Sequence, residues 1–217
     1  MIVISTNNGS KFLPNLLKSI DVYGAHGHEI CIVDTGSTDA EFISYLNSLD
    51  RGKYQVTKTP YVGYDTGAYV WAYKNYVSDE YIFMHDSMEI ISDTWVAAFR
   101  DDKCDVCYYA GFPMAFDEDA QKQRLIDIGI YNEKAPYGVF GPIFYAKRRI
   151  LDAMDVKFDL RKVVPSNKLD QMGMERGWSM MAESVGARIA WLSMIRSDLQ
   201  YENVFYRSMK KFRPTRG

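Results

Sequence analysis

The stretch EICIVDTGSTD, residues 29–39, decides the fold class of this 217-residue chain. Residues 30–33 form an apolar run of the length of a buried strand, and Asp34 closes it. The polar residues TGSTD that follow form a turn, and several of them can cap the N-terminus of a helix. A helix is then predicted from apolar residues at helical spacing, namely Phe42, Ile43, Leu46 and Leu49.

The same order of strand, polar turn and helix occurs on both sides of this stretch. Before it, IVIS (residues 2–5) leads through TNNGS into a helical pattern. After it, YQVTKT (54–59) leads through PYVGYDTG into another helical pattern, and YIFMHDSMEI (81–90) supplies a fourth strand. Strands that alternate with helices in this way predict an α/β fold, with a mostly parallel central sheet and helices on both of its faces.

Three polar clusters, TNN, DTGSTD and HDS, come directly after predicted strands. Parallel strands bring their carboxyl ends to one edge of the sheet, where ligands bind in such folds. The cluster HDS (85–87) places a histidine and a carboxylate where a buried strand leaves the core. The sequence therefore predicts a ligand site at this edge.

The second half of the chain is less regular. DVCYYAGF (105–112) and GVFGPIFYA (138–146) are predicted strands, and the segment 112–137 is predicted to be a loop-rich flap or acceptor-side insertion. A helical stripe then precedes a last strand, ARIAWL (187–192). The basic tail MKKFRPTRG (209–217) is predicted to be a frayed end.

Composition indicates one globular domain. Hydrophobic residues make up 47% of the chain, enough for one sizeable core, so residues 1–217 are expected to form a single domain. The 26 Lys and Arg nearly balance the 28 Asp and Glu, which gives no reason to expect nucleic acid as a partner. No apolar run approaches the roughly 20 residues that span a bilayer. Three cysteines, an odd and sparse number, favour a reducing compartment, and we expect a cytoplasmic location.

The segments IVISTNNGSKFLPNLLKSI, EICIVDTGSTD and FMHDSMEI, with the Gly67-Ala68 turn into a helix, resemble the nucleotide-sugar-binding half of a GT-A glycosyltransferase, closest to glycosyltransferase family 2. The resemblance covers residues 1–100 and returns more weakly over 138–191. It implies a Rossmann-like donor-binding half (1–100) and an acceptor-binding half with the C-terminal tail (101–217). The chain is compact for this family, so we expect either one domain of a longer multi-enzyme polypeptide or a minimal version such as some large DNA viruses encode.

The implied activity is transfer of a sugar from a nucleoside-diphosphate sugar to a hydroxyl of a glycan or glycoprotein, with UDP favoured over TDP or GDP. Asp34 would bond the uracil or ribose, and the alternative is that it only caps its turn. Asp65 would reach the sugar or diphosphate, and the alternative is that Asp65 or Thr66 caps a helix. The implied donor-binding residues are Thr6, Asn7, Asn8, Asp34, Asp65, Gly67, Asp86 and Ser87.

HDS falls where the family carries its metal-binding Asp-x-Asp motif. A Mn²⁺ or Mg²⁺ ion would neutralise the diphosphate leaving group. The sequence departs from the motif, because His85 replaces the first Asp and Ser87 the last. Asp86 and His85 are the expected metal ligands, since imidazole is acceptable to Mn²⁺. The alternative is that Asp86 and Ser87 simply cap a turn.

An inverting member of the family also needs a general base. The family places it in an acidic pair about eleven residues before a glycine that closes a helix, and counting back from Gly186 reaches Glu175. Met174 replaces the usual acidic neighbour. The N-terminus of a helix would keep the Glu175 carboxylate ionised. Asp170 is the reserve candidate, and the alternative is that Glu175 is a plain first-turn glutamate.

Two other functions fit parts of the sequence. A nucleotidyltransferase would need a loop rich in glycine and arginine after the first strand, whereas STNNGSKF has one glycine and no arginine. A sugar-nucleotide or carbohydrate-binding domain without catalysis would explain the irregular HDS motif. Replacing Glu175 distinguishes this binding domain from the transferase.

Overall fold

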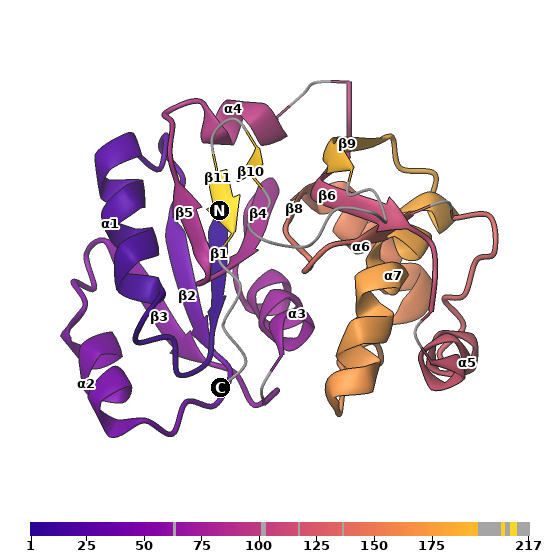
Figure 1. Ribbon diagram of the computed structural model, residues 1–217, viewed down its shortest axis with the longest axis horizontal. Coiled ribbons are helices and arrows are strands. Elements are labelled where there is room, and N and C mark those ends of the chain that lie inside the picture. Colours follow the sequence, from indigo (N-terminus) through magenta and orange to yellow (C-terminus); the bar gives the residue numbers. More distant parts are fainter. Residues whose placement is uncertain are drawn as a thin grey trace.

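The computed structural model of the chain describes residues 1–62, 64–100, 103–116, 118–135, 137–194, 205–206 and 209–211. The strands are β1 (Ile2–Thr6), β2 (Ile30–Asp34), β3 (Tyr54–Lys58), β4 (Glu80–His85), β5 (Met88–Ile90), β6 (Val106–Pro113), β7 (Tyr137–Val139), β8 (Phe144–Lys147), β9 (Ile189–Met194), β10 (Phe205–Tyr206) and β11 (Met209–Lys211). The helices are α1 (Leu13–Tyr23), α2 (Ala40–Ser48), α3 (Asp65–Asn75), α4 (Trp95–Phe99), α5 (Asp119–Asp127), α6 (Arg148–Phe158) and α7 (Lys168–Ser184). Figure 1 shows how these elements are arranged.

The central sheet has the strand order β3-β2-β1-β4-β8-β6-β7, and β9 pairs with the other edge of β6. Strands β1 to β4 are mutually parallel, as the repeated strand–helix order predicts. Strand β8 runs antiparallel to both β4 and β6, and β7 runs antiparallel to β6. Strands β1, β2, β3, β4, β6 and β9 therefore share one direction, so the predicted mostly parallel sheet is confirmed.

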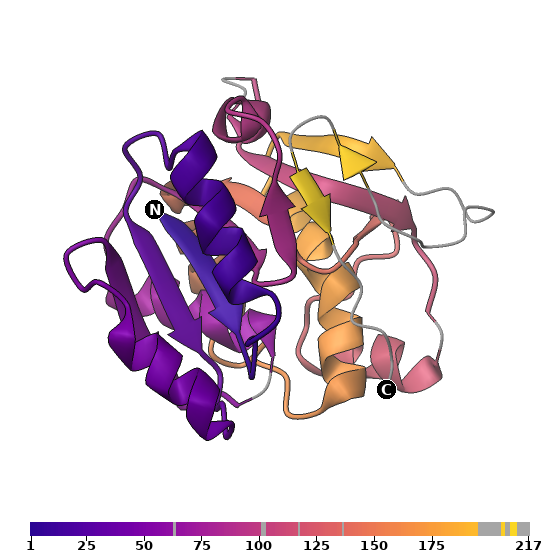
Figure 2. The ribbon, with the colours of Figure 1, turned by 60° about the vertical axis from the view of Figure 1, so that its left-hand side comes forward.

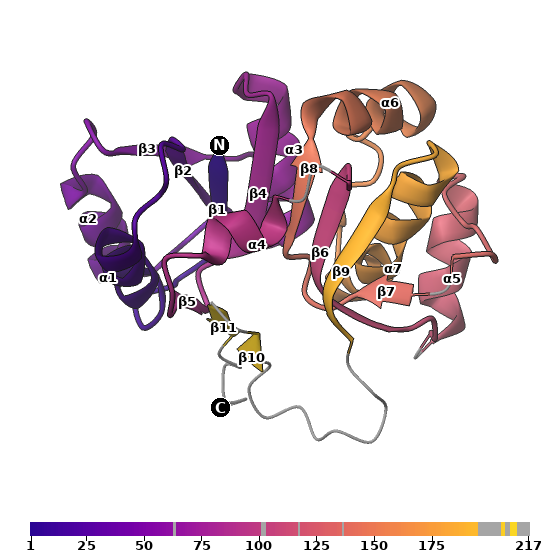
Figure 3. The same cartoon turned by 90° about the horizontal axis from the view of Figure 1, so that it is seen from above.

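Each face of the sheet carries its own hydrophobic core, because side chains alternate along every strand. Ile2 and Ile4 of β1 pack with α1, α2 and α4, whereas Val3 packs with α3, α6 and α7. Figure 3 shows α1 and α4 on one side of the strands and α3 and α6 on the other. The predicted helical cover of both faces is confirmed.

Several elements differ from those predicted. The strand expected over 138–146 is two strands, β7 and β8, separated at Gly141, whose φ is 39°. Helix α5 lies inside the segment predicted to be a flap, with Leu125 buried. Strand β11 pairs antiparallel with β5, so the start of the basic tail is not a frayed end. The rest of that tail, 212–217, lies outside the described residues.

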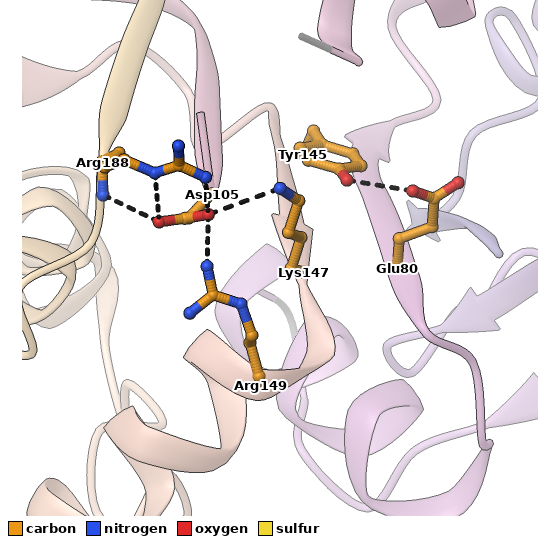
Figure 4. Close-up of polar contacts among 6 residues, drawn as sticks. All are labelled: Glu80, Asp105, Tyr145, Lys147, Arg149 and Arg188. Carbon is orange, nitrogen blue, oxygen red and sulfur yellow. Dashed lines mark hydrogen bonds and ion pairs between the residues drawn. The ribbon is translucent and has the colours of Figure 1, made fainter. Parts of the chain in front are cut away.

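The two halves of the chain meet at the pairing of β4 with β8. Tyr81 of β4 pairs with Ala146 of β8, and the Tyr145 hydroxyl donates a hydrogen bond to Glu80 Oε2 at 2.9 Å. Figure 4 shows this contact. One continuous sheet therefore joins the donor-side and acceptor-side halves expected from the sequence.

A buried carboxylate holds the second half together at the start of β6. Asp105 accepts hydrogen bonds from Arg188 Nε at 3.1 Å and Arg188 Nη2 at 2.9 Å. Lys147 Nζ lies 3.4 Å from the same carboxylate, which also accepts a hydrogen bond from Arg149 (Figure 4). These cations come from the end of β8, the start of α6 and the residue before β9, so one side chain links three elements to β6.

Helix α7 has 17 residues and begins at the end of the molecule where β1 points (Figure 2). Its buried side includes Trp178, whose Nε1 donates to Thr66 Oγ1 of α3 at 3.2 Å. Among the helices that the structure describes, none combines the length and apolarity needed to cross a bilayer.

Candidate functional site

A cavity of about 350 Å³ lies at the carboxyl ends of β1 and β4. Its wall comes from the end of β1 and the loop after it, the residue after β2, the first residue of α3, and the end of β4 with the two residues that follow. The lining residues are Ser5, Thr6, Asn7, Asn8, Gly9, Phe12, Thr35, Asp65, His85, Asp86 and Ser87. Polar groups far apart in sequence meet here because their strands are parallel neighbours, as the sequence predicts.

Asp86 forms the most acidic corner of this cavity. Its Oδ2 accepts a hydrogen bond from Thr6 Oγ1 at 2.6 Å. The pKa of the Asp86 carboxyl is raised to about 6, chiefly by burial and also by the negative charge of Asp65, against the opposing hydrogen bonds from Thr6 and from the Ser87 and Asn7 backbones. At neutral pH the site therefore contains a poorly compensated negative charge, which a cation would stabilise.

Asp65 supplies a second carboxylate to the same cavity. It is the first residue of α3, and Tyr64, the N-cap residue, makes no side-chain cap. The Ser5 hydroxyl donates a short hydrogen bond to Asp65 Oδ1, which ties the start of α3 to the end of β1. Thr66 instead accepts the hydrogen bond from Trp178. The alternative that Asp65 or Thr66 caps α3 is therefore wrong.

The two asparagines after β1 shape the floor of the cavity. Asn7 Nδ2 donates to the Thr35 carbonyl at 3.1 Å. Asn8 has a φ of 50°, and its Oδ1 accepts from the backbone N–H groups of Thr38 and Asp39, both at 2.9 Å. These bonds hold the loop after β1 against the loop after β2, so part of the role of Asn8 is structural.

Asp34 is not among the residues that line the cavity. Its Oδ1 accepts from the backbone N–H groups of Gly36 at 3.2 Å and Ser37 at 2.8 Å, and the side chain is buried. The turn-capping alternative is therefore what the structure shows for this oxygen. The other oxygen of Asp34 accepts no hydrogen bond from the part of the chain described, so a nucleoside contact through it stays a prediction.

His85 and Ser87 flank Asp86 and are both buried. His85 Nδ1 lies 3.1 Å from Ser87 Oγ, which fixes the orientation of the imidazole ring. The described residues contain no group of three or more His, Cys, Asp or Glu side chains arranged to hold a metal ion. The donor set of the His85 imidazole and the poorly compensated Asp86 carboxylate fits a hard cation that takes its remaining ligands from a phosphate group, as Mg²⁺ and Mn²⁺ commonly do.

Gly67 lies outside the cavity lining. A Cβ at this position would come within 2.6 Å of Tyr61 Cβ and 3.5 Å of Val164 Cγ1. The absence of a side chain therefore allows the close approach of Tyr61 to α3. A direct approach of the Gly67 backbone to a donor stays a prediction.

Glu175 and Asp170 both lie on α7, outside the cavity lining. Helix α7 begins at Lys168, so Glu175 is two turns inside the helix and the expectation of a first-turn glutamate is wrong. The first-turn carboxylate is Asp170, which accepts from Ser166 N at 3.0 Å and Ser166 Oγ at 2.7 Å. Burial would raise the pKa of Asp170, but these bonds and the nearby Arg124 lower it overall. The Asp170 carboxylate is thus occupied by hydrogen bonds at the start of α7.

Glu175 lies further along the same helix. Its Oε2 lies 3.7 Å from Arg176 Nη1, and its side chain is 24% exposed. Trp178, one helical turn further on, contacts the residue next to Asp65. Glu175 therefore lies on the part of α7 that approaches the start of α3.

The sequence matches no protein-family model and no curated protein. Solved structures are similar to it over 92% of the chain. They include S. aureus TarS 1–349 in complex with UDP-GlcNAc, with a TM-score of 0.51 and 17% identity, and GalNAc-T7 with UDP, GalNAc and Mn²⁺, with a TM-score of 0.57 and 14% identity. Glucosyl-3-phosphoglycerate synthase from Mycobacterium tuberculosis, in complex with UDP, has a TM-score of 0.50 and 14% identity. These proteins are GT-A glycosyltransferases.

This chain has the GT-A fold. It spans 58% of TarS 1–349, 44% of GalNAc-T7 and 70% of the synthase. The cavity at β1 and β4 lies where ligands bind in open parallel sheets, so the fold and the geometry indicate the same edge.

Four lining residues were missed from the sequence: Ser5, Gly9, Phe12 and Thr35. Ser5 and Thr35 adjoin Thr6 and Asp34, so a wider window around each strand end would have included them. Gly9 was missed because its importance comes from a contact distant in sequence: a Cβ there would lie 2.0 Å from Asp86 Oδ2.

Proposed function

We propose that this protein is a glycosyltransferase that moves a sugar from a nucleoside-diphosphate sugar, UDP-sugar being favoured, to a hydroxyl of a glycan or glycoprotein, with inversion. The observation that carries the proposal is the cavity bearing Asp65, His85 and Asp86 at the carboxyl edge of a GT-A sheet. The same proposal treats residues 1–217 as one domain, with donor binding in 1–100 and acceptor binding in 101–217. The proposed location is the cytoplasm, which the odd and sparse number of cysteines favours.

The donor would occupy the cavity with its nucleoside near Thr6, Asn7, Asn8 and Asp34. The diphosphate would lie toward Asp65, Asp86 and Ser87, with Gly67 behind. A divalent cation held by Asp86 and His85 would neutralise the diphosphate charge. That similar structures were solved with UDP, and GalNAc-T7 with Mn²⁺ as well, supports the choice of nucleotide and ion.

Glu175 is the proposed general base. Its carboxylate takes the proton of the acceptor hydroxyl while the hydroxyl oxygen bonds to the anomeric carbon. The bond from that carbon to the diphosphate breaks, and the nucleoside diphosphate leaves with the electron pair. Because attack and departure take place on opposite faces of the carbon, the configuration inverts. The hydrogen bonds from Ser166 occupy the Asp170 carboxylate at the start of α7, which supports Glu175 over Asp170 as the base.

A thermal melting screen tests the donor site directly. We expect one nucleoside diphosphate among UDP, TDP, GDP and CDP, with UDP favoured, to raise the melting temperature in the presence of Mn²⁺. At about 100 times its dissociation constant, a ligand stabilises by roughly 2.7 kcal/mol, which shifts the midpoint by a few degrees. NAD serves as the negative control. A shift without Mn²⁺ would remove the metal from the proposal, and no shift with any nucleotide would contradict it.

Replacing Gly9 with alanine tests whether Asp86 lies in the donor site. The added Cβ would meet Asp86 Oδ2 at 2.0 Å and Thr6 Oγ1 at 2.5 Å, so the carboxylate must move. We expect Gly9→Ala to weaken UDP binding by about tenfold or more, measured by calorimetric titration with Mn²⁺. Gly52→Ala is the matched control, since its nearest contact is the exposed Asp50 Oδ1 at 3.2 Å. Equal affinity in the two variants would place the nucleotide elsewhere.

A binding domain without catalysis is the second candidate function. The observation that favours it is the lack of a three-ligand metal group among the described residues, together with the irregular HDS motif. It predicts the same melting shift without any release of UDP from a bound UDP-sugar. Turnover by the unaltered protein would exclude it.

A further inference from the structure

Tyr69 carries a fully buried hydroxyl without a hydrogen-bond partner among the described residues. The ring lies on α3, with its centroid 4.8 Å from that of Phe83 and 6.0 Å from that of Phe144. Buried hydroxyls are almost always paired, because burial removes their bonds to water. A donor left unpaired at this position suggests that its acceptor comes into place in another state of the site.

The negative charges of the two carboxylates in the cavity, Asp65 and Asp86, act on the Tyr69 hydroxyl. Burial, with the charges of Asp65 and Asp86, raises the pKa of Tyr69 well above its usual range, so the hydroxyl keeps its proton and can donate. Asp65 is four residues before Tyr69 on α3, so the two residues lie on the same face of the helix, one turn apart.

One carboxylate oxygen of Asp65 is able to accept this hydrogen bond. Its Oδ1 is occupied by the Ser5 hydroxyl. Its Oδ2 accepts no hydrogen bond in the part of the chain that the structure describes. Among the described residues, the Tyr69 hydroxyl is thus a hydrogen-bond donor without an acceptor, and Asp65 Oδ2 is an acceptor without a donor. The two residues lie one helical turn apart on α3.

We propose that Tyr69 is a positioning residue of the donor pocket, whose hydroxyl donates to Asp65 Oδ2 when a nucleotide is bound and holds that carboxylate in place. The inference rests on the proposed function, because it needs a nucleotide in the cavity. Tyr69 is absent from the cavity lining, so it acts through Asp65 rather than by touching the ligand.

A double-mutant cycle with UDP and Mn²⁺ as the probe tests this role. Tyr69→Phe is expected to raise the dissociation constant of UDP by about tenfold, the loss expected for a hydrogen bond to a charged group. In an Asp65→Ala background, the same change is expected to have no further effect, because its acceptor is already gone. The melting temperature of the free protein should not fall in Tyr69→Phe, since the deleted hydroxyl has no partner there.

Tyr108→Phe is the matched control. Its hydroxyl is equally buried but donates to the Trp178 carbonyl at 2.9 Å, so its removal should lower the melting temperature and leave UDP affinity unchanged. Unchanged UDP affinity in Tyr69→Phe would overturn the inference, and so would a tenfold loss that persists in the Asp65→Ala background. Failure of the unaltered protein to bind UDP would contradict the proposed function itself, and the first titration alone reveals it.

Discussion

Replacing Glu175 with glutamine is expected to slow sugar transfer by about 10²–10⁴-fold while leaving donor affinity unchanged. Glutamine has the size of glutamate but cannot take the acceptor proton, and Glu175 is not among the residues that line the cavity at β1 and β4. The rate can be measured as UDP release from a UDP-sugar, with water as the acceptor, and affinity by calorimetric titration. A rate within twofold of the unaltered protein would show that Glu175 is not the base.

Asp170→Asn is the matched control for this experiment. We expect it to cost about 1 kcal/mol of stability, because the hydrogen bonds from Ser166 to the carboxylate weaken, and to leave UDP release unchanged. If Asp170→Asn stops UDP release and Glu175→Gln does not, the reserve candidate is the base. Donor binding without release in the unaltered protein would instead support the non-catalytic binding domain.

Replacing Asp86 with asparagine is expected to stabilise the free protein at neutral pH and to abolish Mn²⁺-dependent nucleotide binding. The folded-state pKa of about 6 lies above the ordinary value of 3.8, so the folded state binds more protons than the unfolded state between these pH values. Stability linked to Asp86 is therefore fully present below about pH 4 and lost as the pH rises through 6. The difference of about 2 pKa units corresponds to roughly 3 kcal/mol above pH 6.

Urea unfolding of both proteins between pH 4 and 8 measures this effect. The two unfolding free energies should agree near pH 4 and diverge by pH 7, with the variant higher. Asp39→Asn makes the same chemical change at the exposed N-cap of α2, where asparagine caps as well as aspartate, and should stay within about 0.5 kcal/mol. A variant less stable at pH 7 than the unaltered protein would show that the Asp86 charge is already compensated.

The strands and helices of the first half could be predicted because each one carries a regular hydrophobic pattern. The alternation of Ile2, Val3 and Ile4 between the two cores follows from strand geometry alone. Helix α5 was missed because Leu125 and Gln121 are its only buried residues, too few to give a helical stripe. The pairing of β11 with β5 was missed because three-residue strands have no period to detect.

The cavity could be located from strand ends, but the roles of its residues could not. Asp34 and Asp86 both follow apolar runs, yet Asp34 caps a turn whereas Asp86 accepts a hydrogen bond from Thr6 and lines the cavity together with Asp65. The difference arises from contacts between segments far apart in the chain, which local sequence does not record. The expected position of Glu175 in the first turn of α7 was wrong for a similar reason. The helix begins earlier, because Asn167 Oδ1 caps it by accepting a hydrogen bond from Asp170 N at 3.0 Å.

The charge cluster around Asp105 gives the second half of the molecule an acid response opposite to that of the cavity. Hydrogen bonds from Arg188 hold the pKa of Asp105 well below its usual range, although burial acts to raise it. Arg149 and Lys147 lower the pKa further. The stability from this carboxylate is present above its ordinary pKa of about 4 and is lost as the pH falls below it. Protonation would leave three cations facing one another where β8, α6 and β9 meet β6. Acid unfolding should therefore start at β9, while protonation of Asp86 stabilises the structure around the cavity.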